Sequence, residues 1–215
     1  MWAGWVVGLA GGLEAALGRP LRDELYLALG FDAAAGHAIA GGPLAATPMA
    51  EIRELTRRCV RGLPGVDDAA ADAAVAGAWT APDPVASAAP LTDLPALLGG
   101  LRRRGIGVAV ATSDDRAPTL ATLEALGIAA LVEGIVCADD GLPVKPRPDA
   151  VHALCARLGV PPARAAVIGD SPADLGMARA ARVGLSIGVL SGVGSADDLG
   201  PLADLLLPSV AALES

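Results

Sequence analysis

Two carboxylates stand where a short apolar run meets the start of a helical pattern. Residues 165–168 are apolar, Gly169 and Asp170 follow, and Asp174 comes one helical turn later. Carboxylates at this spacing suit a hard cation such as Mg²⁺, which takes one or two of them and keeps several waters. The same pattern also fits a helix whose N-cap is Asp170 or Ser171, with Asp174 as a first-turn acid that the helix dipole favours. Both interpretations stay open from the sequence.

A second polar group follows another apolar run. Residues 108–111 lead into Thr112 and Ser113. A hydroxyl and backbone N–H groups at the end of a strand can hold phosphate oxygens. The alternative is a plain strand-to-helix turn in which Asp114 or Asp115 caps the next helix.

The chain's one lysine lies between these two groups. Lys145 stands between Val144 and Pro146, and every other basic residue among the 16 is an arginine. Lysine supplies a compact charge with three rotatable donors, which a planar guanidinium does not. Its presence here indicates a site that requires a compact charge with rotatable donors. The alternative is a chance surface residue in an arginine-biased composition.

Short apolar runs alternate with helical patterns from residue 91 onward. We expect strands at 106–111, 134–138, 165–168, 184–190 and 205–207, and helices at 92–104, 117–126, 148–158 and 172–181. This alternation predicts an α/β fold with a parallel sheet covered by helices on both faces, in a three-layer Rossmann-like core. Ligands of such sheets bind beyond the carboxyl ends of the strands, so chemistry is expected there.

The first part of the chain has a different pattern. Helices are expected near residues 9–17, 22–29, 49–60 and 66–79, with glycine-rich turns between them. A proline-rich stretch at 80–90 has no regular period and indicates a boundary. The predicted domains are therefore a helical one at residues 1–88 and an α/β one at 89–215.

Composition excludes several classes of protein. The chain has 215 residues, 53% of them hydrophobic, and a net charge of −8, which makes nucleic acid a poor partner. The longest uncharged run, residues 33–50, is broken by glycines and prolines, so no membrane span is expected, and no signal peptide pattern is found. Cys59, Cys137 and Cys155 lack metal-ligand spacing and predict free thiols in a reducing, cytoplasmic setting.

The ordered set of motifs resembles the haloacid dehalogenase-like (HAD) phosphohydrolases, in particular the phosphoglycolate phosphatase-like branch with a helical cap. The set comprises Thr112-Ser113 after a strand, Lys145-Pro146, and a strand followed by Gly-Asp-x-x-x-Asp ending at Asp174. The resemblance extends over residues 91–213, including the tail with Gly188-Val189 and Ser191-Gly192, and more loosely over the helical first part. It implies a HAD-like α/β core in which residues 1–88 form a cap that selects the substrate.

The same resemblance implies an activity and its residues. The chain is expected to hydrolyse a small phosphorylated metabolite, a phosphoglycolate-like phosphomonoester, with Mg²⁺ and through an aspartyl-phosphate. Asp170 would bind the metal, and Asp174 would bind it through water or orient Lys145. Lys145 and Thr112 would be the catalytic residues that hold the phosphoryl oxygens, with Ser113 as a supporting contact.

The family's first motif, Asp-x-Asp-x-Thr, does not occur in the chain. It would supply the nucleophile and the general acid/base, at the end of a strand in the middle of the sheet. Residues 1–17 look like the helix that follows this motif in relatives, so we expect the missing strand upstream of Met1. Its absence would leave a gap with unpaired backbone groups on two strands. We do not expect Trp5 to Leu9 to replace it, because no acid follows them.

Three other interpretations account for some of these residues. One is a catalytically inactive relative that only binds a phosphorylated ligand. A receiver-type signalling module also uses Asp, Thr and Lys, but its acids come first in the chain, whereas here they come last. A dinucleotide-binding loop at Gly192-Val193-Gly194 lacks the third glycine. The sequence assigns no role to His37 or His152, and no oligomeric state.

Overall fold

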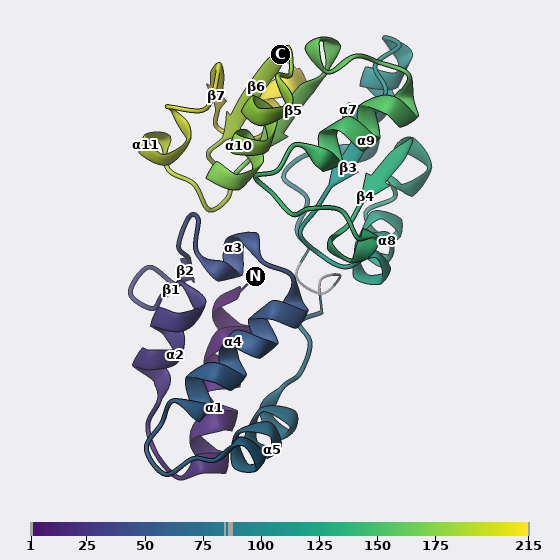
Figure 1. Cartoon of the computed structure of the whole chain (residues 1–215). Helices are drawn as coiled ribbons and strands as arrows, with labels where there is room; N and C mark the ends of the chain where they lie inside the picture. The colour runs from purple at the N-terminus through teal and green to yellow at the C-terminus, as the bar shows by residue number, and fades with distance from the viewer. Residues whose placement is uncertain (1, 84, 86–87, 215) are drawn as a thin grey trace. The chain divides into compact units, whose positions relative to one another are not determined.

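The computed structural model describes residues 2–83, 85 and 88–214. The chain divides into two compact units, Met1–Pro82 and Asp83–Ser215 (Figure 1). The division lies within the proline-rich stretch that marks a boundary in the sequence. Each unit is described by itself, and the role of the first as a cap stays a prediction.

The first unit is a bundle of helices. Its elements are α1 (Trp2–Leu17), α2 (Arg22–Leu29), the short α3 (Pro43–Ala46), α4 (Met49–Arg61) and α5 (Asp68–Ala78), with an antiparallel pair β1 (Phe31–Asp32) and β2 (His37–Ala38). Helix α1 packs on α5, α2 on α4 and α4 on α5, which buries Leu13, Leu25 and Ile52 completely. Trp5 to Leu9 lie inside α1, so this segment is a helix and does not replace a strand, as expected.

The second unit is the predicted α/β part. Its strands are β3 (Ala109–Ala111), β4 (Gly134–Val136), β5 (Ala166–Gly169), β6 (Leu185–Val189) and β7 (Leu205–Leu207), and every pairing among them is parallel. Its main helices are α7 (Leu94–Arg103), α8 (Arg116–Ala125), α9 (Asp149–Leu158) and α10 (Pro172–Ala181), with the four-residue α11 (Ala196–Leu199). The α/β fold class is therefore confirmed.

Several helix starts differ by one or more residues from the expected ranges, and α7 shows the reason. The residue that caps α7 is Asp93, whose side chain accepts a hydrogen bond from the backbone N–H of Ala96 at 2.9 Å. The range expected from the sequence, 92–104, began at Thr92, one residue before this cap. Both residue types are good caps, so the spacing to the first helical turn decides which one is used.

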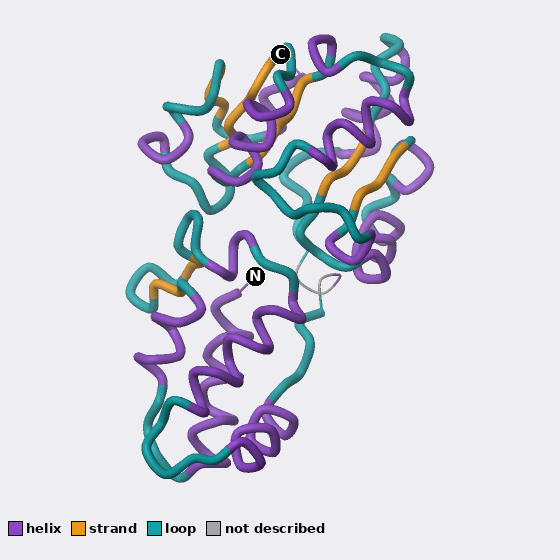
Figure 2. The backbone as a smooth tube through the Cα atoms, in the orientation of Figure 1, coloured by secondary structure: helices purple, strands orange, loops and turns teal. Residues whose placement is uncertain are grey.

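The strands form two sheets instead of one. Strand β3 pairs with β4, and a separate sheet has the order β5-β6-β7 (Figure 2). Within the described residues, no strand is hydrogen-bonded between β3 and β5. Strands β3 and β5 are thus edge strands of separate sheets, each with one paired neighbour, and the missing first strand stays a prediction.

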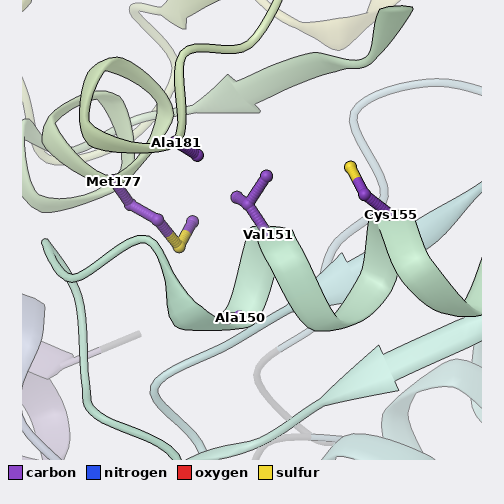
Figure 3. Packing of buried hydrophobic residues seen from close by; sticks show 5 residues of the cluster. All are labelled: Ala150, Val151, Cys155, Met177 and Ala181. Carbon is purple, nitrogen blue, oxygen red and sulfur yellow. The ribbon is translucent and has the colours of Figure 1, made fainter. Parts of the chain in front are cut away.

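Helices α9 and α10 nevertheless give the two sheets a shared core. Figure 3 shows their buried cluster, which consists of Ala150, Val151, Cys155, Met177 and Ala181. Packed against it are Ala111 and Val136 from the first sheet and Val167 from the second. Because side chains alternate along a strand, Ile168 points to the opposite face, where it is 39% exposed.

Two further expectations concern the whole chain. In the described part, no helix combines the length and apolar character needed to cross a membrane. The three cysteines are free thiols, with Cys137 and Cys155 buried and Cys59 partly buried.

Candidate functional site

Lys145 joins the end of the first sheet to the start of α10. Its Nζ donates to the backbone oxygen of Ala111 at 3.0 Å and to Oδ1 of Asp174 at 2.7 Å. The side chains of Lys145 and Asp174 are each 13% exposed, so this ion pair is largely buried. An ammonium group has three N–H donors, and the described residues accept two of them. One donor is therefore left at the carboxyl end of β3.

The capping box at the start of α10 holds the Asp174 side chain in position. Its Oδ2 accepts from the hydroxyl of Ser171 at 2.6 Å and from the Ser171 backbone N–H at 3.2 Å, and the Asp174 N–H donates back to the hydroxyl. Pro172 occupies the first helical turn, where its missing N–H costs nothing. Ser171, one of the two caps considered from the sequence, is thus the N-cap. The cap and the lysine contact are made by one carboxylate.

Gly169 allows the strand to approach this carboxylate closely. A Cβ atom at position 169 would lie 2.2 Å from the Cβ of Asp174, which no side chain could tolerate without movement of the backbone. The glycine that ends β5 is therefore required by the packing of Asp174.

Asp170 is held by a loop that the sequence did not connect to it. Its Oδ2 accepts from the backbone N–H of Val193 at 3.0 Å, and its backbone oxygen accepts from the N–H of Gly194 at 2.8 Å. A Cβ at Gly192 would lie 1.8 Å from Asp170 Oδ2, and one at Gly194 would lie 2.7 Å from the Asp170 oxygen. Two glycines flanking one residue after a strand are the signal that could have revealed this role.

Thr112 and Ser113 follow β3 directly. The Thr112 N–H continues the pairing with β4 by donating to the oxygen of Val136 at 2.9 Å. Its hydroxyl accepts from the Asp114 N–H at 3.0 Å and donates to the Asp114 carboxylate at 3.3 Å. The hydroxyl of Ser113 has no hydrogen bond within the described residues. Thr112 therefore organises the turn, and Asp115, at the N-cap of α8, makes no side-chain cap bond.

The loops after β3 and β4 concentrate negative charge. Burial, together with the neighbouring carboxylates of Asp139 and Asp114, raises the pKa of Asp115. Arg116 pairs with Asp140 and lowers the pKa of that carboxyl, with help from the Cys137 backbone N–H. Lys145 adds a positive charge at the end of β3.

The carboxylates near Lys145 offer few free oxygens to a cation such as Mg²⁺. Among the described residues, no group of three or more His, Cys, Asp or Glu side chains is gathered as a metal site. Both oxygens of Asp174 are engaged by Lys145 and Ser171, whereas Asp170 keeps its Oδ1 without a protein partner in the described part. One carboxylate oxygen is a sufficient protein contribution for an ion that retains its waters. The geometry favours the predicted role of Asp174 as the partner of Lys145.

The sequence of the chain matches a known class of proteins. A family model described as haloacid dehalogenase-like hydrolase matches residues 15–182, which is more than half of the chain. The chain belongs to the haloacid dehalogenase-like hydrolase family. One curated relative is the phosphoglycolate phosphatase of Rhodospirillum rubrum, which is 41% identical over 119 residues, covering 54% of this chain and 49% of the relative. The chain thus spans about half the length of that relative.

Solved structures agree on the fold. A β-phosphoglucomutase from Clostridium difficile superimposes with a TM-score of 0.61 at 16% identity, covering 98% of this chain and 86% of that one. A hydrolase from Pseudomonas syringae gives a TM-score of 0.60 at 22% identity, with 96% and 87% covered. At these identities the likeness concerns the fold alone.

Proposed function

We propose that this chain is part of a phosphatase that hydrolyses a small phosphomonoester. The observation that carries the proposal is the largely buried ammonium of Lys145, held between the end of β3 and Asp174 with one N–H left over. A fixed cation at the carboxyl end of a parallel strand suits the oxygens of a phosphoryl group, where positioning and charge stabilisation supply most of the rate.

Thr112 and Ser113 would hold the phosphoryl oxygens together with Lys145. They follow Ala111 directly, and the backbone oxygen of Ala111 accepts from Lys145, so this turn begins one residue after a Lys145 contact. The Ser113 hydroxyl and the backbone N–H groups of this turn are donors suited to phosphate oxygens. We assign the Thr112 hydroxyl a phosphate contact as well, made when its O–H turns from the Asp114 carboxylate to the ligand.

Asp170 would hold Mg²⁺ through Oδ1, because Val193 fixes the other oxygen of the carboxylate. A bound Mg²⁺ would supply positive charge to the phosphoryl oxygens. Asp174 would orient Lys145, and a contact with the ion would run through water.

The nucleophile is proposed to come from a strand upstream of Met1 that pairs with β3 and β5. The free sides of these two strands support this placement, and the chain contains no Asp-x-Asp. An Asp carboxylate at the end of that strand would bond to phosphorus as the ester P–O bond breaks, and a second acid would protonate the leaving oxygen. Water would then hydrolyse the aspartyl-phosphate, releasing phosphate and restoring the carboxylate.

The substrate class is proposed from the relatives. The Rhodospirillum rubrum protein is a phosphoglycolate phosphatase, which supports a small phosphorylated metabolite of this kind. Free thiols support a reducing compartment, the cytoplasm. We further propose that the helical unit acts as the cap that selects the substrate.

The test uses the chain together with its natural upstream sequence. We expect Mg²⁺-dependent release of phosphate from p-nitrophenyl phosphate, and loss of that release in Lys145→Ala and in Asp170→Ala. Arg147→Ala is the matched control, because Arg147 is a neighbouring cation whose side chain is 71% exposed. Unchanged activity in the lysine and aspartate variants would overturn the proposed site, as would an upstream sequence without an Asp-x-Asp.

A second candidate is a protein that binds a phosphoester without turning it over. The absence of Asp-x-Asp from the chain favours it for residues 1–215. We expect residues 1–215 alone to release no phosphate from p-nitrophenyl phosphate. Thermal stabilisation by phosphoglycolate, in a protein that retains no activity when the upstream sequence is present, would establish the binding role.

A further inference from the structure

We infer that Ser171 is a positioning residue that sets the direction of the Lys145 ammonium through Asp174. The inference rests on the proposed function for its consequence, the capture of a phosphate oxygen. Its structural part concerns three side chains in a row, Ser171, Asp174 and Lys145, joined by hydrogen bonds of 2.6 Å and 2.7 Å.

The carboxylate of Asp174 transmits the orientation because its two oxygens are rigidly linked. Ser171 binds Oδ2 through its hydroxyl and, at a longer 3.2 Å, through its backbone N–H. Fixing Oδ2 fixes Oδ1, which is the oxygen that accepts from Lys145. Gly169 adds to this restraint, because its backbone lies against the Asp174 side chain.

Among the described residues, the end of the Lys145 side chain has one restraint besides Asp174, the backbone oxygen of Ala111. Its four-carbon side chain is flexible, and only Asp174 and the Ala111 oxygen hold its end within the described residues. Two bonds determine where the third N–H points. If Asp174 turns, that N–H turns with it and no longer points at one fixed position beyond β3.

The capping boxes at α10 and α11 have the same hydrogen bonds but differ in burial. Ser195 and Asp198 form the same box at α11, with a hydroxyl–carboxylate bond of 2.6 Å and a return bond of 3.2 Å. Ser195 is exposed, so water can replace its hydroxyl. Ser171 is only 4% exposed, and water cannot easily take its place. Ser195→Ala is therefore the matched control for Ser171→Ala.

The single lysine makes the test specific. Protein of residues 1–215, labelled with ¹³C-lysine, gives NMR signals from Lys145 alone. A held side chain shows two separate ε-proton resonances, and a freely rotating one shows a single averaged resonance. We expect two in the unmodified protein and in Ser195→Ala, one in Ser171→Ala, and two again in Ser171→Thr, which keeps the hydroxyl.

Titration with inorganic phosphate connects this signal to binding. We expect the Lys145 ε resonances to shift on addition of phosphate, and Ser171→Ala to raise the Kd about tenfold, the weight of one hydrogen bond to a charged group. Far-UV circular dichroism and Tm confirm that each variant is folded. A Ser171→Ala variant that fails to fold leaves Ser171→Thr against Ser171→Val as the deciding pair.

Two results would overturn the inference. One is a Lys145 spectrum in Ser171→Ala that superimposes on that of the unmodified protein. The other is an equal change in Ser195→Ala, which would show a general effect of helix capping. If phosphate moves no Lys145 signal in the unmodified protein, the phosphate-binding part of the proposed function fails, while the spectra still decide the positioning role.

Discussion

Asp115, at the start of α8, carries a charge that its surroundings disfavour. Burial and the carboxylates of Asp139 and Asp114 raise its pKa in the folded state above the unfolded value. Stability from this group is therefore present at low pH and is lost as the pH rises through the folded pKa. We expect Asp115→Asn to raise Tm at pH 7 and to leave it unchanged near pH 3, measured by thermal unfolding.

Asp140 is the matched comparison because its pKa shifts in the opposite direction. Arg116 and the Cys137 N–H lower the pKa of Asp140, so its stabilisation is present at neutral pH and is lost as the pH falls through the folded pKa. Asp140→Asn should accordingly lower Tm at pH 7. Equal changes of Tm in both variants would contradict the electrostatic explanation.

The unpaired hydroxyl of Ser186 allows a second test, of the energetic cost of one buried polar atom. Its side chain is completely buried in β6, and its hydroxyl oxygen has no partner in the described part of the chain. Ser186→Ala should leave the free energy of unfolding within about 0.5 kcal/mol or raise it, because a buried unpaired hydroxyl is costly. Urea unfolding measures this. Thr56→Val, which removes a bond of 2.9 Å to the Ile52 oxygen, should lower the free energy by about 1 kcal/mol.

The sequence pointed to Lys145 and Asp174 but could not settle how they act. Their types and their order among the apolar runs are visible in the chain, whereas their contact requires the loop with Lys145 to meet the first turn of α10. Ser171 was recognised only as a possible cap. The contacts of residues 192–194 with Asp170 use backbone N–H groups. Every residue type except proline has this group, so only the spacing of the glycines could indicate the contacts from the sequence.

At the scale of elements, α1 contains two adjacent glycines in different surroundings. A Cβ at Gly11 meets nothing within 4 Å, whereas one at Gly12 would lie 3.0 Å from the Cβ of Ala78 in α5. Gly11→Ala should stabilise the first unit by about 0.5–1 kcal/mol, since glycine costs that much inside a helix. Gly12→Ala should gain nothing or lose stability. Urea unfolding of the two variants checks the prediction, and a larger gain for Gly12→Ala would contradict it.

The ends of α10 were easier to predict than the start of β3. Helix α10 spans Pro172–Ala181 as expected, because Ser171, Pro172 and Asp174 specify its first turn locally. Strand β3 was predicted from residue 106, yet it is Ala109–Ala111. A strand extends only as far as its neighbours run beside it, and β3 has one neighbour, β4. Strand length therefore depends on partners that a local pattern does not contain.

At the scale of the whole molecule, the break in the sheet should be visible in amide exchange. Strand β6 has hydrogen-bonded neighbours on both sides, while β3 and β5 each have one. In a parallel edge strand, roughly every second N–H lacks a strand partner. We expect hydrogen–deuterium exchange to be slowest in β6 and faster in β3 and β5. Restoring the natural upstream sequence should slow exchange in β3 and β5, and unchanged exchange would contradict the proposed strand.

The α/β class and the order of its elements could be predicted from the alternation of apolar runs and helical patterns. The two-unit division could be predicted from the change of pattern near residues 80–90. Which helix joins the two sheets could not, because the shared cluster on α9 and α10 combines small residues such as Ala150 and Ala181 that carry little signal in a sequence.

The free sides of β3 and β5 also have a consequence for how residues 1–215 behave at high concentration. Unpaired N–H and C=O groups along a strand are a template on which another extended chain can add. The exposed side chains of Ile168, Leu185 and Leu205 lie on the second sheet and give such an encounter an apolar surface. We expect copies of residues 1–215 to associate through these strand edges at high concentration.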